Sequence, residues 1–442
     1  VAGIDENEFL RRTQGTFKIG IEFVHWGRLG ERYMHGFGRL GQDLWTVRFD
    51  QYWQKMRRLG RAGPLEAYSI TRMASKANRF MPARGDLPNS PLNDIAHAYH
   101  FDAGLYAKYL AEVAQARGVQ RTEGRIVQVS QRPSDGHVDA VVMENGERIE
   151  GELFLDCSGF RGLLIEQTLN TGYEDWSHWL PCDRALAVPC ASAPVLTPYT
   201  RSTAHRAGWQ WRIPLQNRIG NGHVYSSAHV SDDEAATTLL ANLDGRPLAD
   251  PRPVKFTTGR RRLGWNRNVV AIGLASGFLE PLESTSIHMI QSAIQRLIDW
   301  FPDQGFSAVD VDEYNRRMAW EYECVRDFII LHYHLNQRTD SAFWKDCAAM
   351  SIPDSLRHKM DLYRSRGRLV RVDNELFAED SWLQVMEGQN LPVEGYHPLV
   401  DVQPEDEIAT YLDSVRSVIE QCVQVMPPHA DWVEQHCAAP AA

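Results

Sequence analysis

The sequence predicts a mixed α/β protein whose C-terminal part is mostly helical, and three observations support this class. Residues 16–26, TFKIGIEFVHW, alternate with the period of a strand, which places Lys18 on the face opposite four apolar residues. Residues 268–273, NVVAIG, form a short apolar run typical of a buried strand, and apolar residues at helical spacing follow it until Pro302. From roughly residue 310 onward the pattern is mostly helical.

Shorter elements are expected between these segments. A helix is expected over residues 104–118, where Gly118 ends it. Three short strands are expected after this helix, at 125–131, 138–143 and 153–155. The turn Glu144-Asn145-Gly146 is a strong hairpin signal. Residues 208–227 predict a second hairpin, which turns at Gly220-Asn221-Gly222 and carries two tryptophans on one strand face.

The composition excludes several classes of protein. The formal net charge is -10 and the densest basic run is Arg260-Arg261-Arg262, so we expect no nucleic-acid partner. No apolar run approaches the ~20 residues of a membrane helix, so we expect no membrane association. The 7 cysteines include no CxxC pair, which favours free thiols in the cytoplasm over disulfides or a metal site.

The segment 268–290 combines a strand, a small-residue turn, an acidic loop and a helix. The N-terminus of such a helix has free N–H groups that attract anions or the electron-rich edge of a cofactor. Ser284 and Thr285 are good N-caps for it, and Glu283 comes just before them. A carboxylate at this position is also compatible with a simple interaction with the helix dipole.

Two further features have both a functional and a purely structural interpretation. In DCSGFRGLL, residues 156–164, a strand runs into a Ser-Gly turn and then a helix, which suits a cofactor at Ser158 and Gly159. A tight βα turn without a ligand explains the same residues. Lys18 lies on a strand face where most lysines are solvated, so its chemistry does not follow from the alternation alone.

The stretch MHGFGRLG, residues 34–41, contains a literal G-x-G-x-x-G. In dinucleotide-binding proteins this pattern follows a buried strand and opens a long helix, with an acidic residue about 20 positions later. The residues before it, Glu31 to His35, do not read as a buried strand, and no long helix clearly follows. The match therefore predicts no pyrophosphate-binding loop at this place.

Five stretches together resemble the flavin-dependent halogenases, the group typified by the tryptophan halogenases, in register from about residue 8 to beyond residue 345. They are TFKIGIEFVHW, AYHFDAGLYAKYL, DCSGFRGLLI, GWQWRIP and GFLEPLESTSIHMIQSAIQRL. The fourth carries the family's W-x-W-x-I-P pattern at Trp209, Trp211, Ile213 and Pro214. Five motifs in order are far more specific than any one of them.

The resemblance implies an FAD-dependent monooxygenase-like α/β fold of the GR2 type. Residues 1–310 would form a flavin-binding and catalytic module, and residues 311–442 a mostly helical region that caps the substrate pocket. It further implies that reduced FAD, supplied by a separate flavin reductase, and oxygen convert a bound chloride or bromide into hypohalous acid. This acid would travel through an internal tunnel to a lysine beside a small aromatic substrate. A homodimer is also expected.

The resemblance assigns roles to individual residues. Lys18 matches the lysine that holds the hypohalous acid, Glu283 the glutamate paired with it, and Ser284 the serine linking the flavin and substrate regions. Thr285 and Ser286 match the pair whose backbone amides hold the halide. The positions that match FAD contacts are Ile126, Leu274 and Ile287, to which we add Ser158 and Gly159.

The same register places MHGFG at the substrate. His35 and Phe37 match residues that line the arene pocket, where their rings would sandwich a planar substrate. Tryptophan halogenases grip the amino acid with a tyrosine pair, which Trp382-Leu383 replaces in this chain. We therefore expect indole or a similar electron-rich arene to be a better substrate than free tryptophan.

Some features depart from the family. Ser286 stands where the tryptophan halogenases have Gly, and His288 where they have an aromatic residue. The family's pyrophosphate loop has no counterpart in the sequence, and we expect it upstream of Val1. Two alternatives remain at this point: an aromatic flavin monooxygenase on the same fold, and a non-catalytic protein that binds flavin or an arene.

Overall fold

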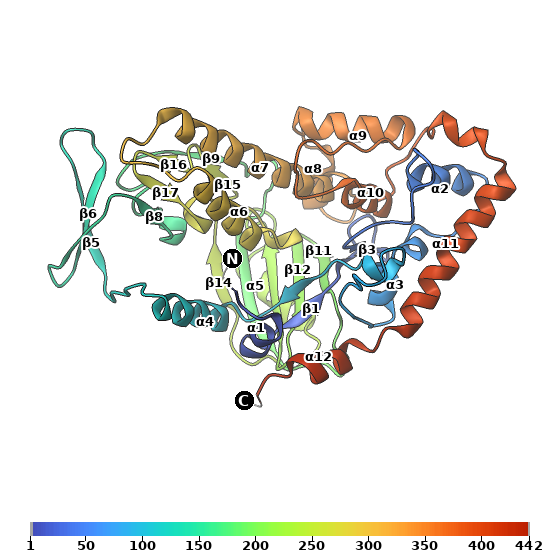
Figure 1. Ribbon diagram of the computed structural model, residues 1–442, viewed down its shortest axis with the longest axis horizontal. Coiled ribbons are helices and arrows are strands. Elements are labelled where there is room, and N and C mark those ends of the chain that lie inside the picture. The colour runs from blue at the N-terminus through green and yellow to red at the C-terminus, as the bar shows by residue number, and fades with distance from the viewer. Residues whose placement is uncertain (1–2, 441–442) are drawn as a thin grey trace. The chain divides into compact units, whose positions relative to one another are not determined.

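The structure is a computed structural model that describes residues 3–440 (Figure 1). Contacts divide the chain into two compact units. The first unit holds the segments up to Val113, Arg184–Val254 and from Ile330 onward, and the second holds Ala114–Asp183 and Lys255–Ile329. Two helices contribute residues to both units: α4, Ala103–Ala116, and α7, Ala308–His334.

A seven-stranded sheet forms the centre of the first unit, in the order β14-β10-β13-β12-β11-β2-β3. Its strands are β2 Gly20–Val24, β3 Arg32–Gly36, β10 Arg184–Cys190, β11 Thr200–His205, β12 Gly208–Pro214, β13 Ile219–Tyr225 and β14 Arg252–Lys255. Strands β2 and β11 run parallel, whereas β2 and β3 are antiparallel. A short separate ladder pairs β1, Thr16–Lys18, with β4, Ala98–His100. The predicted strand over residues 16–26 is thus two strands, β1 and β2.

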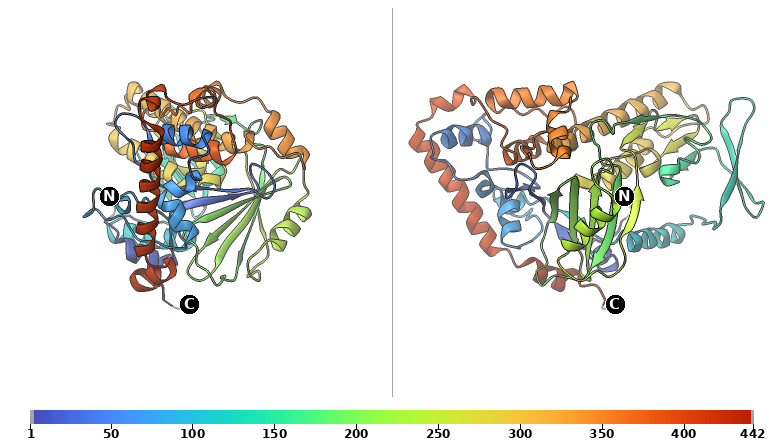
Figure 2. Two further views of the ribbon diagram at one scale, coloured as in Figure 1. Left: turned by 90° about the vertical axis from the view of Figure 1, so that its right-hand side faces the viewer. Right: turned by 180° about the vertical axis from the view of Figure 1, so that it is seen from behind.

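Helices pack around these strands, and α11 runs along α2 and α3 (Figure 2). The helices of the first unit are α1 Glu6–Arg12, α2 Phe49–Arg58, η1 Leu65–Tyr68, α3 Ile70–Lys76, η2 Pro91–Asn93, α5 Asp232–Ala241, α8 Ala342–Ala349, α9 Asp354–Arg366, α10 Glu379–Gly388, η6 Pro398–Val402, α11 Glu405–Val425 and α12 His429–Cys437. The core beside β1 contains Phe17 and Ile19 together with residues of α11 and α12. The prediction of a mostly helical C-terminal part is confirmed.

The second predicted hairpin forms, but its turn is not at Gly220-Asn221-Gly222. These residues lie inside β13, and the turn is at residues 215–218. Gly222 is paired with Trp211 of β12, and a Cβ atom on Gly222 would lie 2.0 Å from the indole ring. The glycine makes room for the tryptophan ring, so the prediction of a turn was wrong because a packing requirement has the same sequence signature.

Three small sheets build the second unit, in the orders β5-β6-β7, β16-β17-β8 and β18-β15-β9. Their strands are β5 Ile126–Gln131, β6 Val138–Met143, β7 Arg148–Glu150, β8 Phe154–Asp156, β9 Tyr173–Asp175, β15 Gly259–Arg261, β16 Trp265–Asn266, β17 Val269–Ala271 and β18 Gly277–Phe278. The helices are η3 Gly159–Arg161, η4 Gly273–Ala275, η5 Pro281–Glu283 and α6 Ser286–Asp299. The hairpin signal at Glu144-Asn145-Gly146 is confirmed between β6 and β7.

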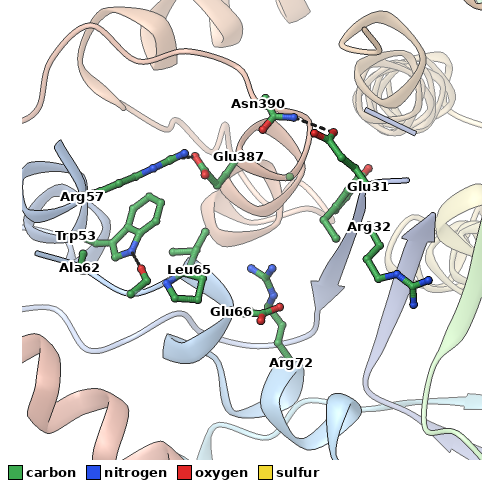
Figure 3. Close-up of a pocket in the computed structure, with 14 residues that line it drawn as sticks. Glu31, Arg32, Trp53, Arg57, Ala62, Leu65, Glu66, Arg72, Glu387 and Asn390 are labelled. Carbon is green, nitrogen blue, oxygen red and sulfur yellow. Dashed lines mark hydrogen bonds and ion pairs between the residues drawn. The ribbon is translucent and has the colours of Figure 1, made fainter. Parts of the chain in front are cut away.

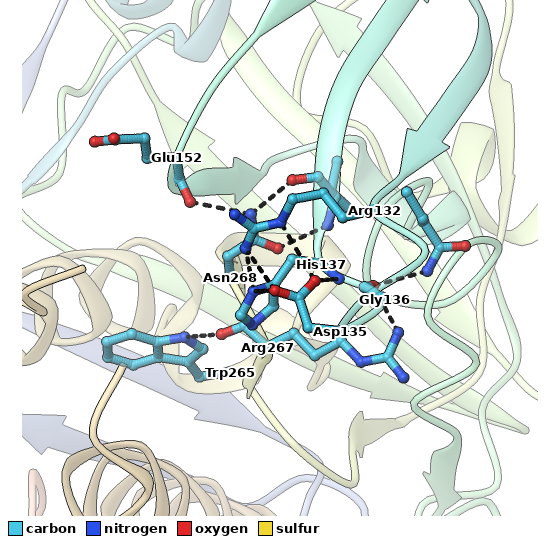
Figure 4. Close-up of polar contacts among 10 residues, drawn as sticks. Arg132, Asp135, Gly136, His137, Glu152, Trp265, Arg267 and Asn268 are labelled. Carbon is cyan, nitrogen blue, oxygen red and sulfur yellow. Dashed lines mark hydrogen bonds and ion pairs between the residues drawn. The ribbon is translucent and has the colours of Figure 1, made fainter. Parts of the chain in front are cut away.

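Asn268 fastens the β5-β6-β7 sheet to the β16-β17 turn (Figure 4). Its side-chain oxygen accepts from the backbone N–H of Val138 at 2.8 Å, and its amide nitrogen donates to the Val138 carbonyl at 2.7 Å. The same nitrogen donates to the Glu152 carbonyl at 3.0 Å. One buried side chain thus supplies the hydrogen bonds that a neighbouring strand would otherwise provide.

The expected helix after the Ser-Gly turn does not form. Only the three-residue η3 and a series of turns follow β8. The buried Asp156 accounts for this geometry, because its carboxylate accepts from the backbone N–H groups of Ser158, Leu164 and Ile165. A side chain that satisfies three amides replaces the hydrogen bonds that a regular helix would make, so the segment forms a tight turn.

Three buried histidines and the half-buried His205 are kept neutral in the first unit. Burial lowers the pKa of His205, His223 and His429 to about 4. Burial, together with the charge of Lys18, lowers the pKa of His100 well below its ordinary value. The hydrogen bonds of His429 also require the neutral form of its ring. Its Nε2 accepts from the Phe17 backbone N–H at 3.3 Å, which leaves the proton on Nδ1, 3.2 Å from the Leu196 carbonyl.

The free energy of unfolding should therefore fall as the pH drops from about 6.5 towards 4, by up to about 1.4 kcal/mol per pH unit for each such histidine. In this range the unfolded chain takes up protons that the folded chain does not. Urea denaturation at several pH values measures the slope. His429→Gln keeps one donor and one acceptor. It should reduce the slope of the unfolding free energy against pH by the contribution of about one proton. The exposed His358→Gln is the control, and an unchanged slope in H429Q would contradict the assignment.

Candidate active site

Lys18 is buried, with 3% of its surface exposed, so it is not a solvated strand lysine. It ends β1, opposite Ala98 of β4. Its Nζ atom lies 5.4 Å from the centre of the Phe37 ring, within the range of a cation–π interaction. The structure thus brings together two residues that the sequence assigned to one site, and it removes the interpretation of Lys18 as a surface residue.

His100 is a neighbour of Lys18 that the sequence did not single out. It faces Thr16 across the β1-β4 ladder, two residues from the Ala98–Lys18 pair and on the same face. The Thr16 hydroxyl donates to the Pro214 carbonyl at 2.8 Å, so it accepts from His100 Nδ1–H at 3.1 Å. The other ring nitrogen, Nε2, then accepts from the Thr200 hydroxyl at 2.9 Å.

These hydrogen bonds fix one neutral tautomer of His100 next to the lysine ammonium. They also explain a family motif, because Pro214 closes the W-x-W-x-I-P pattern and its carbonyl holds the Thr16 hydroxyl. No local sequence pattern predicts this role of His100, because it depends on the pairing of two short strands that lie far apart along the chain. Trp209 and Trp211 of the same motif lie in β12, where Trp209 is fully buried.

His35 and Phe37 form a corner rather than two parallel walls. Their ring centres lie 6.0 Å apart with an angle of 82° between the ring planes, and Phe377 lies 6.3 Å from His35. In this structure the two rings are nearly perpendicular, so they do not form the two parallel walls of the expected sandwich. A planar ligand in this corner would meet one ring face-on and the other edge-on.

Gly36, between these two residues, is needed for close packing. The side chain of Gln384 in α10 accepts from the Gly36 N–H at 2.9 Å and donates to its carbonyl at 3.0 Å. A Cβ atom on Gly36 would lie 2.6 Å from Cγ of Arg72. The G-x-G-x-x-G match thus has a structural cause: β3 ends at Gly36, and the next helix begins only at Phe49, so no pyrophosphate loop forms.

Trp382 lies in α10, where it is buried in the first unit. The Nζ atom of Lys359 lies 4.6 Å from the centre of its ring, and Lys359 is itself held by the Glu375 carboxylate at 2.7 and 2.8 Å. Where the family has its tyrosine pair, this chain thus has an indole ring beside the Lys359 ammonium group, which is itself paired with Glu375. It offers no phenolic hydroxyl to a ligand.

Lys18 belongs to the first unit, whereas Glu283 and the residues after it belong to the second. Glu283 is buried and ends η5. Ser284 follows with φ 60° and ψ 37°, in the left-handed region. For a residue with a side chain this conformation costs roughly 1–2 kcal/mol, which marks the turn between Glu283 and α6 as strained.

The N-terminus of α6 carries a buried hydroxyl without a partner. Thr285 occupies the predicted N-cap position, but its side chain makes no capping hydrogen bond. Thr285 is 2% exposed, and its Oγ1 has no hydrogen-bond partner. A buried polar atom left unsatisfied in this way leaves a hydrogen bond open to a ligand at the start of α6.

Thr285 and Ser286 line a cavity of about 240 Å³ in the second unit. Its other walls are largely apolar and are formed by Gly273, Leu274, Gly277, Phe278, Leu279, Met289, Ile290 and Tyr322. Leu274 also borders a neighbouring cavity of about 390 Å³. Polar groups at one end of an apolar cavity suit a small anion beside a flat aromatic ligand, and these residues fit a flavin and a halide.

The predicted FAD contacts differ in how well they suit that role. Leu274 and Ile287 expose 40% and 38% of their surfaces, as expected of apolar residues that a flat ligand would cover. Ile126 packs against the apolar core of the second unit instead. The Ser158 hydroxyl already accepts from the Leu163 N–H at 2.6 Å, and Gly159 begins η3.

The tryptophan halogenase family model matches residues 1–405. The chain belongs to this family. Tryptophan 7-halogenase KtzQ of Kutzneria sp. (strain 744) is 34% identical over 386 residues, covering 82% of this chain and 71% of that protein. Tryptophan 7-halogenase RebH of Lentzea aerocolonigenes is 33% identical over 383 residues, with the same coverage of 82% and 71%.

Solved structures of flavin-dependent halogenases have the same fold. Xcc4156 from Xanthomonas campestris is 48% identical with a TM-score of 0.96, over 99% of this chain and 87% of that chain. BrvH from Brevundimonas sp. BAL3 is 45% identical with a TM-score of 0.96, over 98% and 88%. The protein is therefore a flavin-dependent halogenase, an enzyme with the monooxygenase-like α/β fold and a helical C-terminal part, as the sequence predicted.

Within residues 3–440, no helix is long and apolar enough to cross a bilayer, and no three metal-ligating side chains come together. The cysteines among these residues form no disulfide.

Thr285→Val tests the unsatisfied hydroxyl directly. An unpaired buried hydroxyl costs about 1–3 kcal/mol, so T285V should raise the Tm measured without halide or flavin. Thr258 is equally buried with an unpartnered hydroxyl, which makes Thr258→Val a matched control. Both variants should be more stable, but only T285V should raise the halide concentration needed for half-maximal turnover, by several-fold. An unchanged halide requirement in T285V would contradict a halide at this cavity.

Proposed function

We propose that this halogenase chlorinates or brominates an electron-rich arene such as indole, with Lys18 presenting hypohalous acid to the ring. The observation that carries the proposal is the buried ammonium group beside the Phe37 ring and the neutral His100. A positioned ammonium donates hydrogen bonds to the oxygen of the acid and holds it at one carbon. Free hypohalous acid would instead oxidise methionine, cysteine and tryptophan without selection.

The flavin and the halide belong to the second unit in this proposal. When bound, reduced FAD would activate oxygen, and the activated oxygen would be the oxidant that converts chloride or bromide into hypohalous acid. The amides of Thr285 and Ser286 hold the halide at the start of α6, where the helix dipole favours an anion. The residues that would hold FAD are Leu274 and Ile287, with Ile126, Ser158 and Gly159 as further predicted contacts.

The substitution on the ring is balanced by two proton transfers. The arene attacks the halogen, the oxygen–halogen bond breaks, and the departing oxygen takes a proton from the Lys18 ammonium to leave as water. The ring carbon then loses its proton to the Glu283 carboxylate, which acts as general base. Ser284 links the flavin and substrate regions. Its backbone, which directly follows Glu283, lies in the strained left-handed region.

Further features of the enzyme remain predictions. We propose that a separate flavin reductase delivers the reduced flavin, that the enzyme is a cytoplasmic homodimer, and that residues 311–442 cap the substrate pocket. The replacement of the tyrosine pair by Trp382-Leu383 supports an arene without an amino-acid group. Buried aromatic residues give such a substrate apolar contacts without a carboxylate anchor.

Lys18→Ala should abolish halogenation of indole while flavin oxidation continues. The assay combines FAD, a flavin reductase, NADH, indole and bromide, and mass spectrometry detects the isotope pair of a brominated product. The matched control is Lys55→Ala, which removes another buried lysine, one that pairs with Asp401 at 2.9 Å. Normal bromination by K18A would refute the mechanism, and a product that has gained one oxygen would favour a monooxygenase.

Indole should be turned over at least tenfold more efficiently than free tryptophan, measured as kcat/KM with the same reductase and halide. The reason is that a zwitterion entering a site without groups to pair its charges loses hydration without compensation, which costs about 1–3 kcal/mol or more. Equal kcat/KM values for the two compounds would refute this substrate preference.

A further inference from the structure

A separate cavity lies within the first unit, at the start of β3 (Figure 3). Its volume is about 560 Å³, and it lies where β3, the segment from α2 to η1, α3 and the end of α10 meet. Its lining consists of Glu31, Arg32, Tyr33, Trp53, Arg57, Ala62, Gly63, Pro64, Leu65, Glu66, Arg72, Glu387, Gly388 and Asn390. The lining includes neither Lys18 nor His35, Phe37 or Trp382, so this cavity is separate from the proposed arene site.

Arg72 extends into this cavity from α3, as Figure 3 shows. Only 8% of its surface is exposed, and its Nε atom has no hydrogen-bond partner. Burial lowers the pKa of its guanidinium group to about 10, which still leaves it charged at neutral pH. A buried guanidinium that lacks hydrogen bonds is costly, and such groups are normally found paired with an anion.

The other charged residues of the cavity already have partners. Arg57 forms an ion pair with Glu387, and Glu66 is held by Lys76 at 2.9 Å. Arg32 pairs with Glu22 at 3.2 Å, and Glu31 with Arg28 at 3.1 Å. Among the described residues, Arg72 is therefore the charged group of this cavity that has no ion pair.

The surroundings of Arg72 restrict the charge and shape of its partner. The guanidinium plane matches a carboxylate through two parallel hydrogen bonds. Three carboxylates, those of Glu31, Glu66 and Glu387, also line the cavity, so an anion with two or more charges would be repelled more strongly than a monoanion. The remaining walls include Tyr33, Trp53 and Leu65, which line the cavity although each is more than nine-tenths buried.

We propose that this cavity is a second binding site, specific for a small aromatic monocarboxylate whose carboxylate pairs with Arg72. The aromatic body of the ligand lies against the wall formed by Trp53, Tyr33 and Leu65. The volume of about 560 Å³ is sufficient for one or two rings. The site is independent of the halogenation chemistry, because it needs neither flavin nor halide.

Isothermal titration calorimetry with benzoate tests the proposal on the purified enzyme without flavin or halide. Benzoate should bind the wild-type protein, and inorganic phosphate should not. Arg72→Met keeps the side-chain stem that packs on Gly36 but removes the charge, and it should weaken benzoate binding at least tenfold. Arg32→Gln is the matched control, because it also removes an arginine from the cavity, and it should change the affinity less than twofold.

Three results would overturn the proposal: no benzoate binding to the wild type, equal affinity in R72M, or phosphate binding that depends on Arg72. Equal affinity in R72M would assign benzoate to another pocket, such as the arene site. If R72M fails to fold, as judged by circular dichroism, Arg72→Lys replaces it in the comparison. R72K keeps one positive charge without the planar fork, and it should weaken benzoate binding by an intermediate factor.

Discussion

The burial of one positive charge on a strand of three residues is the constraint on which the proposed site depends. An ammonium group loses much hydration when it is buried, so its surroundings must supply compensation without taking its proton. The Phe37 ring supplies part of this compensation. His100 is prevented from adding a second positive charge, because Thr16 and Thr200 hold it as one neutral tautomer.

In the second unit, the start of α6 departs from ordinary backbone geometry and hydrogen bonding. Its α6 terminus has a backbone in the left-handed region at Ser284 and an unsatisfied hydroxyl at Thr285, two features that each lower stability in the absence of a ligand. Such local violations of ordinary packing rules are typical of functional sites. The apolar residue Leu274, which borders two cavities, is a third case, because it exposes surface that a core residue would bury.

The sequence was sufficient for the class of fold and the family. It also predicted elements with a clear local period, such as α4, α6, β5 and β6, but no individual elements for α1–α3 or β9–β11. It failed where one residue type serves two purposes. Gly222 suggested a turn, but it makes room for an indole ring. The residues after Asp156 suggested a helix, but the Asp156 carboxylate binds their backbone amides and holds them in a turn. His100 and Arg72 were missed because their roles depend on partners, or on the lack of them, that only the folded chain defines.

Gln384 has a consequence beyond the positioning of Gly36. Strand β3 is at the edge of the seven-stranded sheet, where free backbone groups would invite a strand from another molecule. By bonding both the N–H and the carbonyl of Gly36, the Gln384 amide imitates the next strand and closes the edge at that point. The side chain that holds Gly36, between His35 and Phe37, therefore also protects the enzyme against edge-to-edge aggregation.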